Sequence, residues 1–186
     1  MRRLLAILLF SLLLLPLQAT IEGQYYSADI AEAYYLGIPH FEDELPARSS
    51  LSFAASVGLF GYTQNNWDAS MEVHLFSVTD SLPFGFYQAR GFNSIGANLR
   101  GAYAVNPRLS VFSSLGTEVN FYHDIEEVFA SFSFQVGPQL LIYENTDSRI
   151  LLTFPISLHL RKEITGVQAG IGIRYQLYPT KTGGTP

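Results

Sequence analysis

Ser157 and His159 are the residues of this chain that most resemble a catalytic pair. A serine nucleophile needs a base within about 3 Å and an acid that orients the base. The surrounding sequence alternates like a β-strand, on which residues two apart share a face but stand roughly 6–7 Å from each other. The two side chains therefore cannot touch directly. We expect a hydrogen-bonded serine and histidine in the protein interior, no catalytic residues and no enzyme.

Acidic residues form a second group that could do chemistry. His40 and His123 are each followed by a short acidic run. Clustered carboxylate oxygens suit Ca²⁺ and Mg²⁺, although a solvated charged loop has the same composition. We expect no dedicated metal site and no cofactor. The acidic residues are Glu42, Asp43 and Glu44 in the first run and Asp124, Glu126 and Glu127 in the second.

The composition limits the class of protein. Only 15% of the 186 residues are charged, against about 25% in an ordinary soluble domain, while 48% are hydrophobic. Such a chain is not intrinsically disordered. The absence of cysteine excludes a disulfide framework, cysteine-ligated zinc and thiol catalysis. A net charge of −5 offers no basic surface, so we expect no nucleic-acid partner.

Residues 1–19 have the form of a secretory signal peptide. Arg2 and Arg3 precede an apolar run from Leu4 to Leu15, and a small-residue cleavage site ends at Ala19. The apolar run is too short for a membrane-spanning helix. We expect export and cleavage after Ala19. Removal of this segment takes away most of the surplus hydropathy of the chain but leaves its low charge.

The rest of the chain alternates apolar with small or polar residues, the period of a β-strand. Turn-rich short connections alternate with longer ones, as in outer-membrane barrels. The sequence predicts an all-β, eight-stranded antiparallel up-and-down transmembrane β-barrel over residues 20–178, followed by a short polar tail at 179–186. A short helix at Ser27–Ala33 is an alternative to the first strand, which we assign because such barrels normally have an even strand number. The expected strands are 21–35, 51–61, 67–77, 95–105, 109–121, 128–142, 150–160 and 167–177.

The less apolar face decides which face points outward. It carries serine, glycine, alanine, asparagine and glutamine, and the two lysines of the chain, Lys162 and Lys181, lie outside the strands. A soluble lipocalin-like barrel would carry many more charges on its exterior, so we expect the apolar face to contact lipid. Aromatic residues near the ends of that face suit the membrane interfaces. These residues are Trp67, Tyr103, Phe121 and Tyr175.

Residues 24–178 resemble the small eight-stranded outer-membrane barrels of the OmpA transmembrane-domain, OmpX and OmpW type. The final strand, AGIGIRYQLY, looks like the closing strand that the barrel assembly machinery recognises, which implies insertion by that machinery. The chain departs from the pattern because PTKTGGTP follows Tyr178, where such proteins usually end on Phe or Tyr. Outer-membrane lipid A deacylases share the barrel size but carry the order His-x-Ser, the reverse of the order here; a lipid A-modifying hydrolase is the one enzymatic alternative to the expectation of no enzyme.

An eight-stranded barrel is barely wide enough for its own side chains, and buried polar groups need partners. Counted from the short-turn rim, Glu72 and Arg100 stand at the same height on neighbouring strands. We expect them to form an interior ion pair that plugs the lumen. The whole expected interior cluster is Glu72, His74, Arg100, Glu118, His159 and Arg174.

Two prolines interrupt neighbouring strands. Pairing across the 144–148 turn places Gly137 opposite Pro155 and Pro138 opposite Phe154. Proline cannot donate to the hydrogen-bond ladder, so we expect a bulge or gap there. A lateral opening for an apolar solute is the functional alternative.

These features support three functional hypotheses. The first is a structural or surface-interacting outer-membrane protein, monomeric, in contact with lipid and lipopolysaccharide-like glycolipid. The second is a narrow OmpW-like pathway for small apolar solutes, which the resemblance implies. The third is a soluble periplasmic ligand-binding barrel. Residues of the second long loop that could carry contacts are Phe84, Phe86, Tyr87 and Arg90.

Overall fold

The computed structural model describes residues 22–40, 48–78, 91–122, 128–162 and 164–179. Several predictions lie outside these ranges. They concern the signal peptide and its cleavage after Ala19, the acidic runs after His40 and after His123, His123 itself, Lys181 and nearly all of the 179–186 tail. The loop-contact candidates Phe84, Phe86, Tyr87 and Arg90 also lie outside them. No helix within the described ranges is long and apolar enough to cross a membrane.

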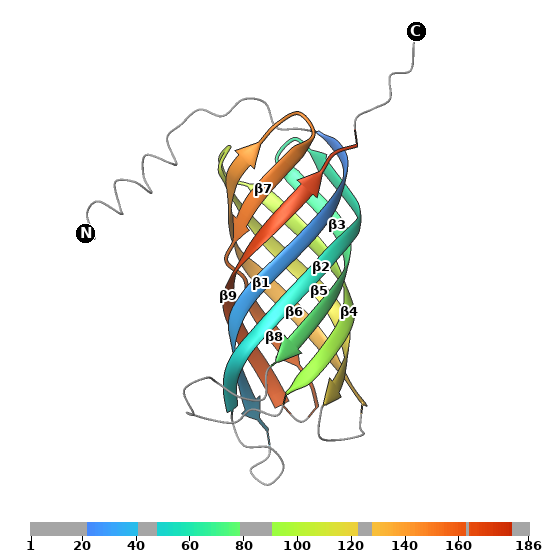
Figure 1. The fold of residues 1–186 in the computed structure, drawn as a ribbon, viewed down its shortest axis with the longest axis vertical. Helices are drawn as coiled ribbons and strands as arrows, with labels where there is room; N and C mark the ends of the chain where they lie inside the picture. The colour runs from blue at the N-terminus through green and yellow to red at the C-terminus, as the bar shows by residue number, and fades with distance from the viewer. Residues whose placement is uncertain (1–21, 41–47, 79–90, 123–127, 163, 180–186) are drawn as a thin grey trace, which may run out of the picture.

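Nine antiparallel strands form one closed sheet (Figure 1). β7 and β8 together occupy a single position between β6 and β9, and β9 pairs back with β1 to close the ring. This confirms the predicted eight-stranded up-and-down barrel. The strands are β1 (Gly23–Pro39), β2 (Arg48–Gln64), β3 (Trp67–Val78), β4 (Phe92–Ala104), β5 (Leu109–Tyr122), β6 (Val128–Glu144), β7 (Ser148–Thr153), β8 (Ile156–Leu160) and β9 (Ile164–Leu177).

Residues 27–33, for which the sequence allowed either a strand or a short helix, are part of strand β1. It pairs along its length with β2 on one side and β9 on the other. Two inward pairs on the seam with β9 consist of very small residues: a Cβ added at Gly170 would lie 2.4 Å from the Cβ of Ala33, and one at Gly172 2.8 Å from that of Ala31. Pairing on both sides satisfies the backbone groups of β1 as extended chain, so the local helical alternative is wrong.

The two ends of the barrel differ. β1 begins and β9 ends at the same end, which also carries the short connections 65–66, 105–108 and 145–147 (Figure 1). We call this end the turn rim and the opposite end the loop rim. Asn65 adopts a positive φ of 53°, which two-residue hairpin turns favour at their first residue.

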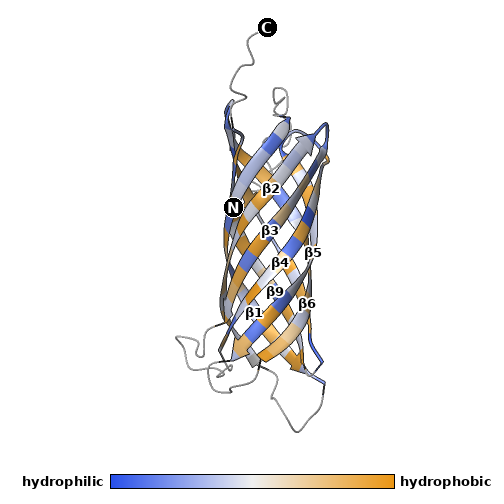
Figure 2. Ribbon diagram, turned by 90° about the vertical axis from the view of Figure 1, so that its right-hand side faces the viewer, coloured by the Kyte–Doolittle hydropathy of each residue, from blue (hydrophilic) through white to orange (hydrophobic). Residues whose placement is uncertain are grey.

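The polarity of the wall is inverted relative to a soluble barrel. Figure 2 shows hydrophilic and hydrophobic residues alternating along the strands. Large apolar residues on all sides of the barrel are exposed, including Ile30, Leu99, Leu115 and Ile173. The buried residues are mostly serine, glutamine, asparagine, histidine, arginine and glutamate. Because a soluble ligand-binding barrel needs the opposite arrangement, the third hypothesis is disfavoured.

The proline patch is a gap between β7 and β8. Gln139 pairs with Thr153 and Val136 with Ile156, so the register continues unchanged across the gap. Pro138 therefore stands opposite Phe154, as expected. Two backbone bonds bridge the interruption: the Phe154 N–H donates to the Pro138 carbonyl at 3.0 Å, and the Gly170 N–H donates to the Pro155 carbonyl at 3.0 Å. The strand is interrupted between β7 and β8, but these backbone hydrogen bonds keep the barrel wall closed.

Candidate functional site: the barrel interior

One ionic centre joins β1, β3, β4 and β9 inside the barrel. Arg174 Nη2 lies 2.7 Å from Glu72 Oε1, and Arg174 Nη1 lies 3.5 Å from Asp29 Oδ2. Ser70 Oγ donates to the same Glu72 oxygen at 2.7 Å. Arg100 lies 4.0 Å from Asp29 and stacks on the Phe112 ring at 3.6 Å. Two buried arginines thus balance the buried carboxylate of Glu72 and the half-buried carboxylate of Asp29.

The predicted pairing of Glu72 with Arg100 is wrong in its partner. Glu72 and Arg100 would stand opposite each other only if Trp67 faced Val105, whereas Trp67 faces Tyr103. Glu72 therefore stands opposite Asn98 and Arg100 opposite Ser70. Arg100 Nη2 instead donates to Gln139 at 2.8 Å. Both residues point inward and are buried, but Glu72 makes its direct ion pair with Arg174.

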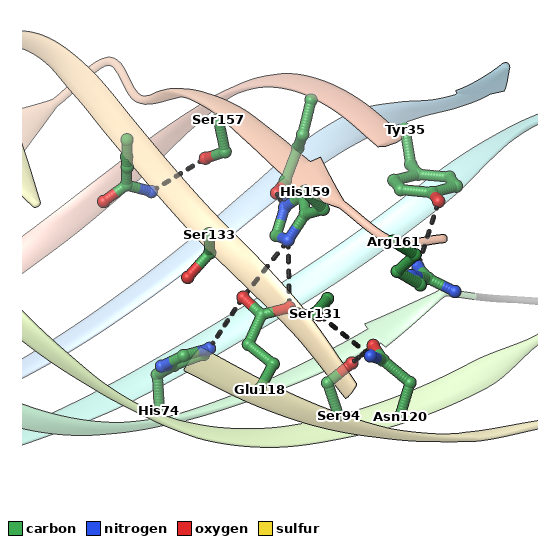
Figure 3. Close-up of polar contacts among 12 residues, drawn as sticks. Tyr35, His74, Ser94, Glu118, Asn120, Ser131, Ser133, Ser157, His159 and Arg161 are labelled. Atoms are coloured by element: carbon green, nitrogen blue, oxygen red, sulfur yellow. Dashed lines mark hydrogen bonds and ion pairs between the residues drawn. The ribbon is translucent and has the colours of Figure 1, made fainter. Parts of the chain in front are cut away.

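A second centre is built around Glu118 of β5 (Figure 3). Glu118 Oε1 lies 3.0 Å from His74 Nε2, and Oε2 lies 3.0 Å from His159 Nδ1. Ser131 Oγ donates to Oε2 at 3.0 Å. The carboxylate is 2% exposed, and it holds side chains from β3, β6 and β8 together. These hydrogen bonds compensate for the hydrogen bonds to water that the carboxylate loses when it is buried.

The arrangement of His159 differs from that of a catalytic base. Its Nδ1 faces Glu118 and its Nε2 lies 3.2 Å from Gln168 Oε1. Ser157 Oγ instead accepts a bond from Gln135 Nε2 at 3.0 Å. The base and the hydroxyl therefore have separate partners (Figure 3). Among the described residues, no group of three or more His, Cys, Asp or Glu side chains could hold a metal ion.

An aromatic cluster lies between this centre and the loop rim. Arg161 Nη2 donates to the Tyr35 hydroxyl at 3.2 Å, Nη1 donates to the Tyr122 hydroxyl, and the guanidinium lies 4.3 Å from the centre of the Phe92 ring. Phe76 lies beside Phe92, with ring centres 5.6 Å apart. We call Tyr35, Phe76, Phe92, Tyr122 and Arg161 the aromatic cap.

Another polar cluster occupies the interior near the turn rim. Tyr25 donates to Asp68, and the Tyr178 hydroxyl lies 3.0 Å from Thr63 Oγ1. Arg149 Nη1 donates to the same tyrosine hydroxyl at 3.0 Å. Burial raises the pKa of Tyr178, which follows β9, above its ordinary value. Tyr178, the last aromatic residue of the chain, thus links β2 and β7 inside the barrel at the turn rim.

Two small cavities lie among the described interior residues. A cavity of about 60 Å³ lies between the two ionic centres, bordered by Asp29, His74, Asn98 and Gln135. A second cavity, of about 50 Å³, lies near the turn rim. Sites for drug-sized molecules measure roughly 300–1,000 Å³, whereas one water needs about 10–15 Å³. His74 lines the larger cavity, and its buried Nδ1 atom has no hydrogen-bond partner among the described residues.

The predicted interface aromatics lie on the outer wall. Trp67 and Tyr103 are directly paired, with ring centres 4.9 Å apart, near the turn rim. Tyr175 also lies near the turn rim and Phe121 near the loop rim. Tyr26, Tyr62 and Tyr143 also point outward and belong to the same set. Their positions near the ends of strands could have identified them from the sequence.

Comparison with solved structures identifies the fold. Ail from Yersinia pestis, in complex with the heparin analogue sucrose octasulfate, matches with a TM-score of 0.55 and 13% identity. The match covers 84% of this chain and 99% of Ail. Neisserial surface protein A matches with a TM-score of 0.50 and 13% identity, over 84% and 98% of the two chains. The chain has the fold of the small outer-membrane β-barrels. No protein-family model and no curated protein sequence matches it.

Within this small-barrel fold, the sequence did not reveal several interior residues. Asp29 was missed because its segment could have been a helix, although the alternation of Tyr25, Ser27 and Asp29 was a usable signal. Arg161 was missed because it follows the last regular position of β8. Gln139 and Gln168 carry no charge, so nothing in the sequence signals that they join the interior cluster, although alternation places Gln168 on the inward face. All six predicted interior residues, Glu72, His74, Arg100, Glu118, His159 and Arg174, are buried.

Proposed function

We propose that this protein is an integral outer-membrane β-barrel with a structural or surface-interacting role, exported by a signal peptide that is cleaved after Ala19. The observation that carries the proposal is the inverted wall: exposed apolar side chains outside and a hydrogen-bonded ionic interior. A lipid bilayer stabilises that arrangement, because closed barrels leave no unpaired backbone in the hydrocarbon. The turn rim faces the periplasm and the loop rim faces outward, as in bacterial barrels of this type.

The interior supports a closed plug rather than a channel. Three layers follow one another between the loop rim and the middle of the barrel. They are the aromatic cap, the centre around Glu118 and the ionic centre around Arg174. Each consists of mostly buried side chains from several strands. Breaking these contacts to admit a solute would leave charged groups without partners. The cost would be on the order of several kcal/mol, as for other broken buried ion pairs.

A narrow OmpW-like pathway for apolar solutes is the second candidate. The observation that favours it is that the 60 Å³ cavity extends to Pro155, at the interruption between β7 and β8. A passage would require separation of the backbone bonds that bridge the interruption. We therefore place it behind the structural role. The wall would open only if Phe154 moved away from Pro138.

Surface interaction would belong to the loop rim. The bound ligand of the Ail structure is a sulfated heparin analogue, but the connections 41–47 and 123–127 here are acidic. Anionic polymers are thus poor candidates for this chain. Divalent cations bridging these carboxylates to the phosphates of an anionic glycolipid fit the charge better. Insertion would depend on the barrel assembly machinery, with β9 as the closing strand.

Two measurements test the proposal. In the first, the refolded protein is run on a denaturing gel with and without heating. A barrel that folds only in detergent or lipid and shifts its mobility on heating supports the proposal, whereas a fold that forms in plain buffer overturns it. In the second, swelling of liposomes containing the protein is measured with small apolar and polar solutes. Swelling above that of empty liposomes would favour the pathway over the plug.

A further inference from the structure

Glu32 is an outward-facing carboxylate in the middle of an apolar wall. It lies on β1, nine residues from Gly23 and seven from Pro39, and its side chain is exposed. Tyr26, Ile30, Leu36 and other apolar residues occupy the outer face of β1 on both sides of it. Among the strand side chains whose exposure is described, Glu32 is the one Asp, Glu, Lys or Arg that points outward.

Nothing in the described part of the chain compensates this carboxylate. Its neighbours across the sheet are Phe53 on β2 and Ile171 on β9, both about half exposed and apolar. The Glu32 side chain forms no hydrogen bond or ion pair with any other described residue. An acid at this depth is unfavourable in lipid hydrocarbon. The interior carboxylates Glu72 and Glu118, in contrast, each have several partners.

Tyr34 offers a matching donor on the same outer face. It is two residues from Glu32, 49% exposed, and its hydroxyl has no partner among the described residues. A two-fold axis along the membrane normal keeps every residue at its own depth and brings the same patch of two copies together. The patch is then self-complementary: the tyrosine hydroxyl of each copy can donate to the carboxylate of the other.

We propose that the outer face of β1 around Glu32 and Tyr34 is an interface for a second copy of this chain within the membrane. Contact between copies covers the carboxylate, supplies it with two-fold related hydroxyl donors and removes it from lipid. Ile30, Phe53 and Ile171 provide an apolar surround that excludes water and strengthens those hydrogen bonds. The interface replaces the monomer expected from the sequence. It rests on the proposed membrane location.

The oligomeric state of variants tests this interface. The wild type, E32Q, E32L and the control T117L, which makes the same kind of change on the outer face of β5, are reconstituted in phosphatidylcholine vesicles. Single-molecule photobleaching counts the copies. Wild type, T117L and E32Q, which keeps an acceptor oxygen, should be dimeric, and E32L should dimerise about tenfold more weakly. Wild type that is monomeric at every lipid ratio, or E32L that dimerises like wild type, overturns the inference.

Cross-linking identifies the partner. Because the chain has no cysteine, I30C places a single thiol beside Glu32, and L115C places one on the outer face of β5. I30C should form a disulfide-linked dimer in the cell envelope while L115C does not. Equal cross-linking of both, or linkage of I30C only to a different protein, overturns the proposal. Heat-modifiable mobility of each variant separates this outcome from failure of the membrane proposal, since a monomer that still inserts contradicts only the interface.

Discussion

Arg174 on β9 reaches Glu72 on β3 inside the barrel, with Nη2 2.7 Å from Oε1, although β1 and β2 lie between their strands. The pair therefore ties the closing strand to a strand three positions away. Asp29 on the intervening β1 contributes a second carboxylate to Arg174. This cross-link makes ring closure and interior charge balance depend on the same residue.

Removal of one partner of this pair should destabilise the barrel strongly. R174M leaves the buried Glu72 and the half-buried Asp29 with fewer compensating charges, and we expect a loss of about 3–5 kcal/mol in the free energy of unfolding. Urea unfolding in lipid vesicles, followed by tryptophan fluorescence of Trp67, measures it. The exposed K162M serves as the control and should change little. The double variant R174M/E72Q should lose less than the sum of the single changes, and simple additivity would contradict a direct pair.

Loss of the Glu118 charge should loosen the second centre. E118Q keeps the size of the side chain but weakens its bonds with His74, His159 and Ser131. We expect a destabilisation of about 1–3 kcal/mol. Histidine ring signals in NMR spectra should shift for both His74 and His159. S157A, which removes a hydroxyl that has another partner, should leave the His159 signals nearly unchanged; a large shift in S157A would point to a serine–histidine contact after all.

The aromatic cap should depend on the guanidinium shape of Arg161. Lysine cannot donate to Tyr35 and Tyr122 while stacking on Phe92. R161K and R161M should therefore lose similar stability, about 1–3 kcal/mol. Thermal unfolding in detergent measures both. If R161K behaves like the wild type, the positive charge alone is sufficient and the geometry of the cap is unimportant.

Gly137 should not tolerate a side chain. A Cβ there would lie 2.1 Å from the Phe154 carbonyl oxygen at the β7–β8 interruption, whereas one at Gly101 has its nearest neighbour at 3.9 Å. We expect G137A to destabilise the barrel by about 1–3 kcal/mol and G101A to be neutral or slightly stabilising. Chemical unfolding of the two variants side by side provides the measurement. Equal stability would mean that the interruption can open at little cost.

A charge on the outer wall should have an effect that depends on depth. Leu115 lies midway along β5, and Val105 follows β4 at the turn rim; both are exposed. L115R should lower stability in lipid vesicles by about 2–4 kcal/mol, and V105R by about 0–1 kcal/mol. Vesicle-based unfolding compares them. Equal penalties at the two depths would argue against a membrane-embedded wall.

The sequence by itself determined the strand class, the approximate strand positions and the direction of each face. Period-two alternation places Ile171 and Ile173 on one face and Arg174 on the other, whatever the neighbouring strands are. The shortage of charge on both faces then favoured lipid outside. Turn-forming residues such as Asn65 and Asn66 marked a hairpin, because the preference of asparagine for turns depends only on the nearby backbone.

Only the tertiary structure decided which inward residues meet. A shift of two residues in register keeps every side chain on its face, so alternation cannot distinguish Trp67 facing Val105 from Trp67 facing Tyr103. That shift separates Glu72 from Arg100. Contacts across the lumen, such as Arg174 with Glu72 and His159 with Glu118, depend on closure of the ring and on the width of the barrel. No local pattern in the chain encodes those distances.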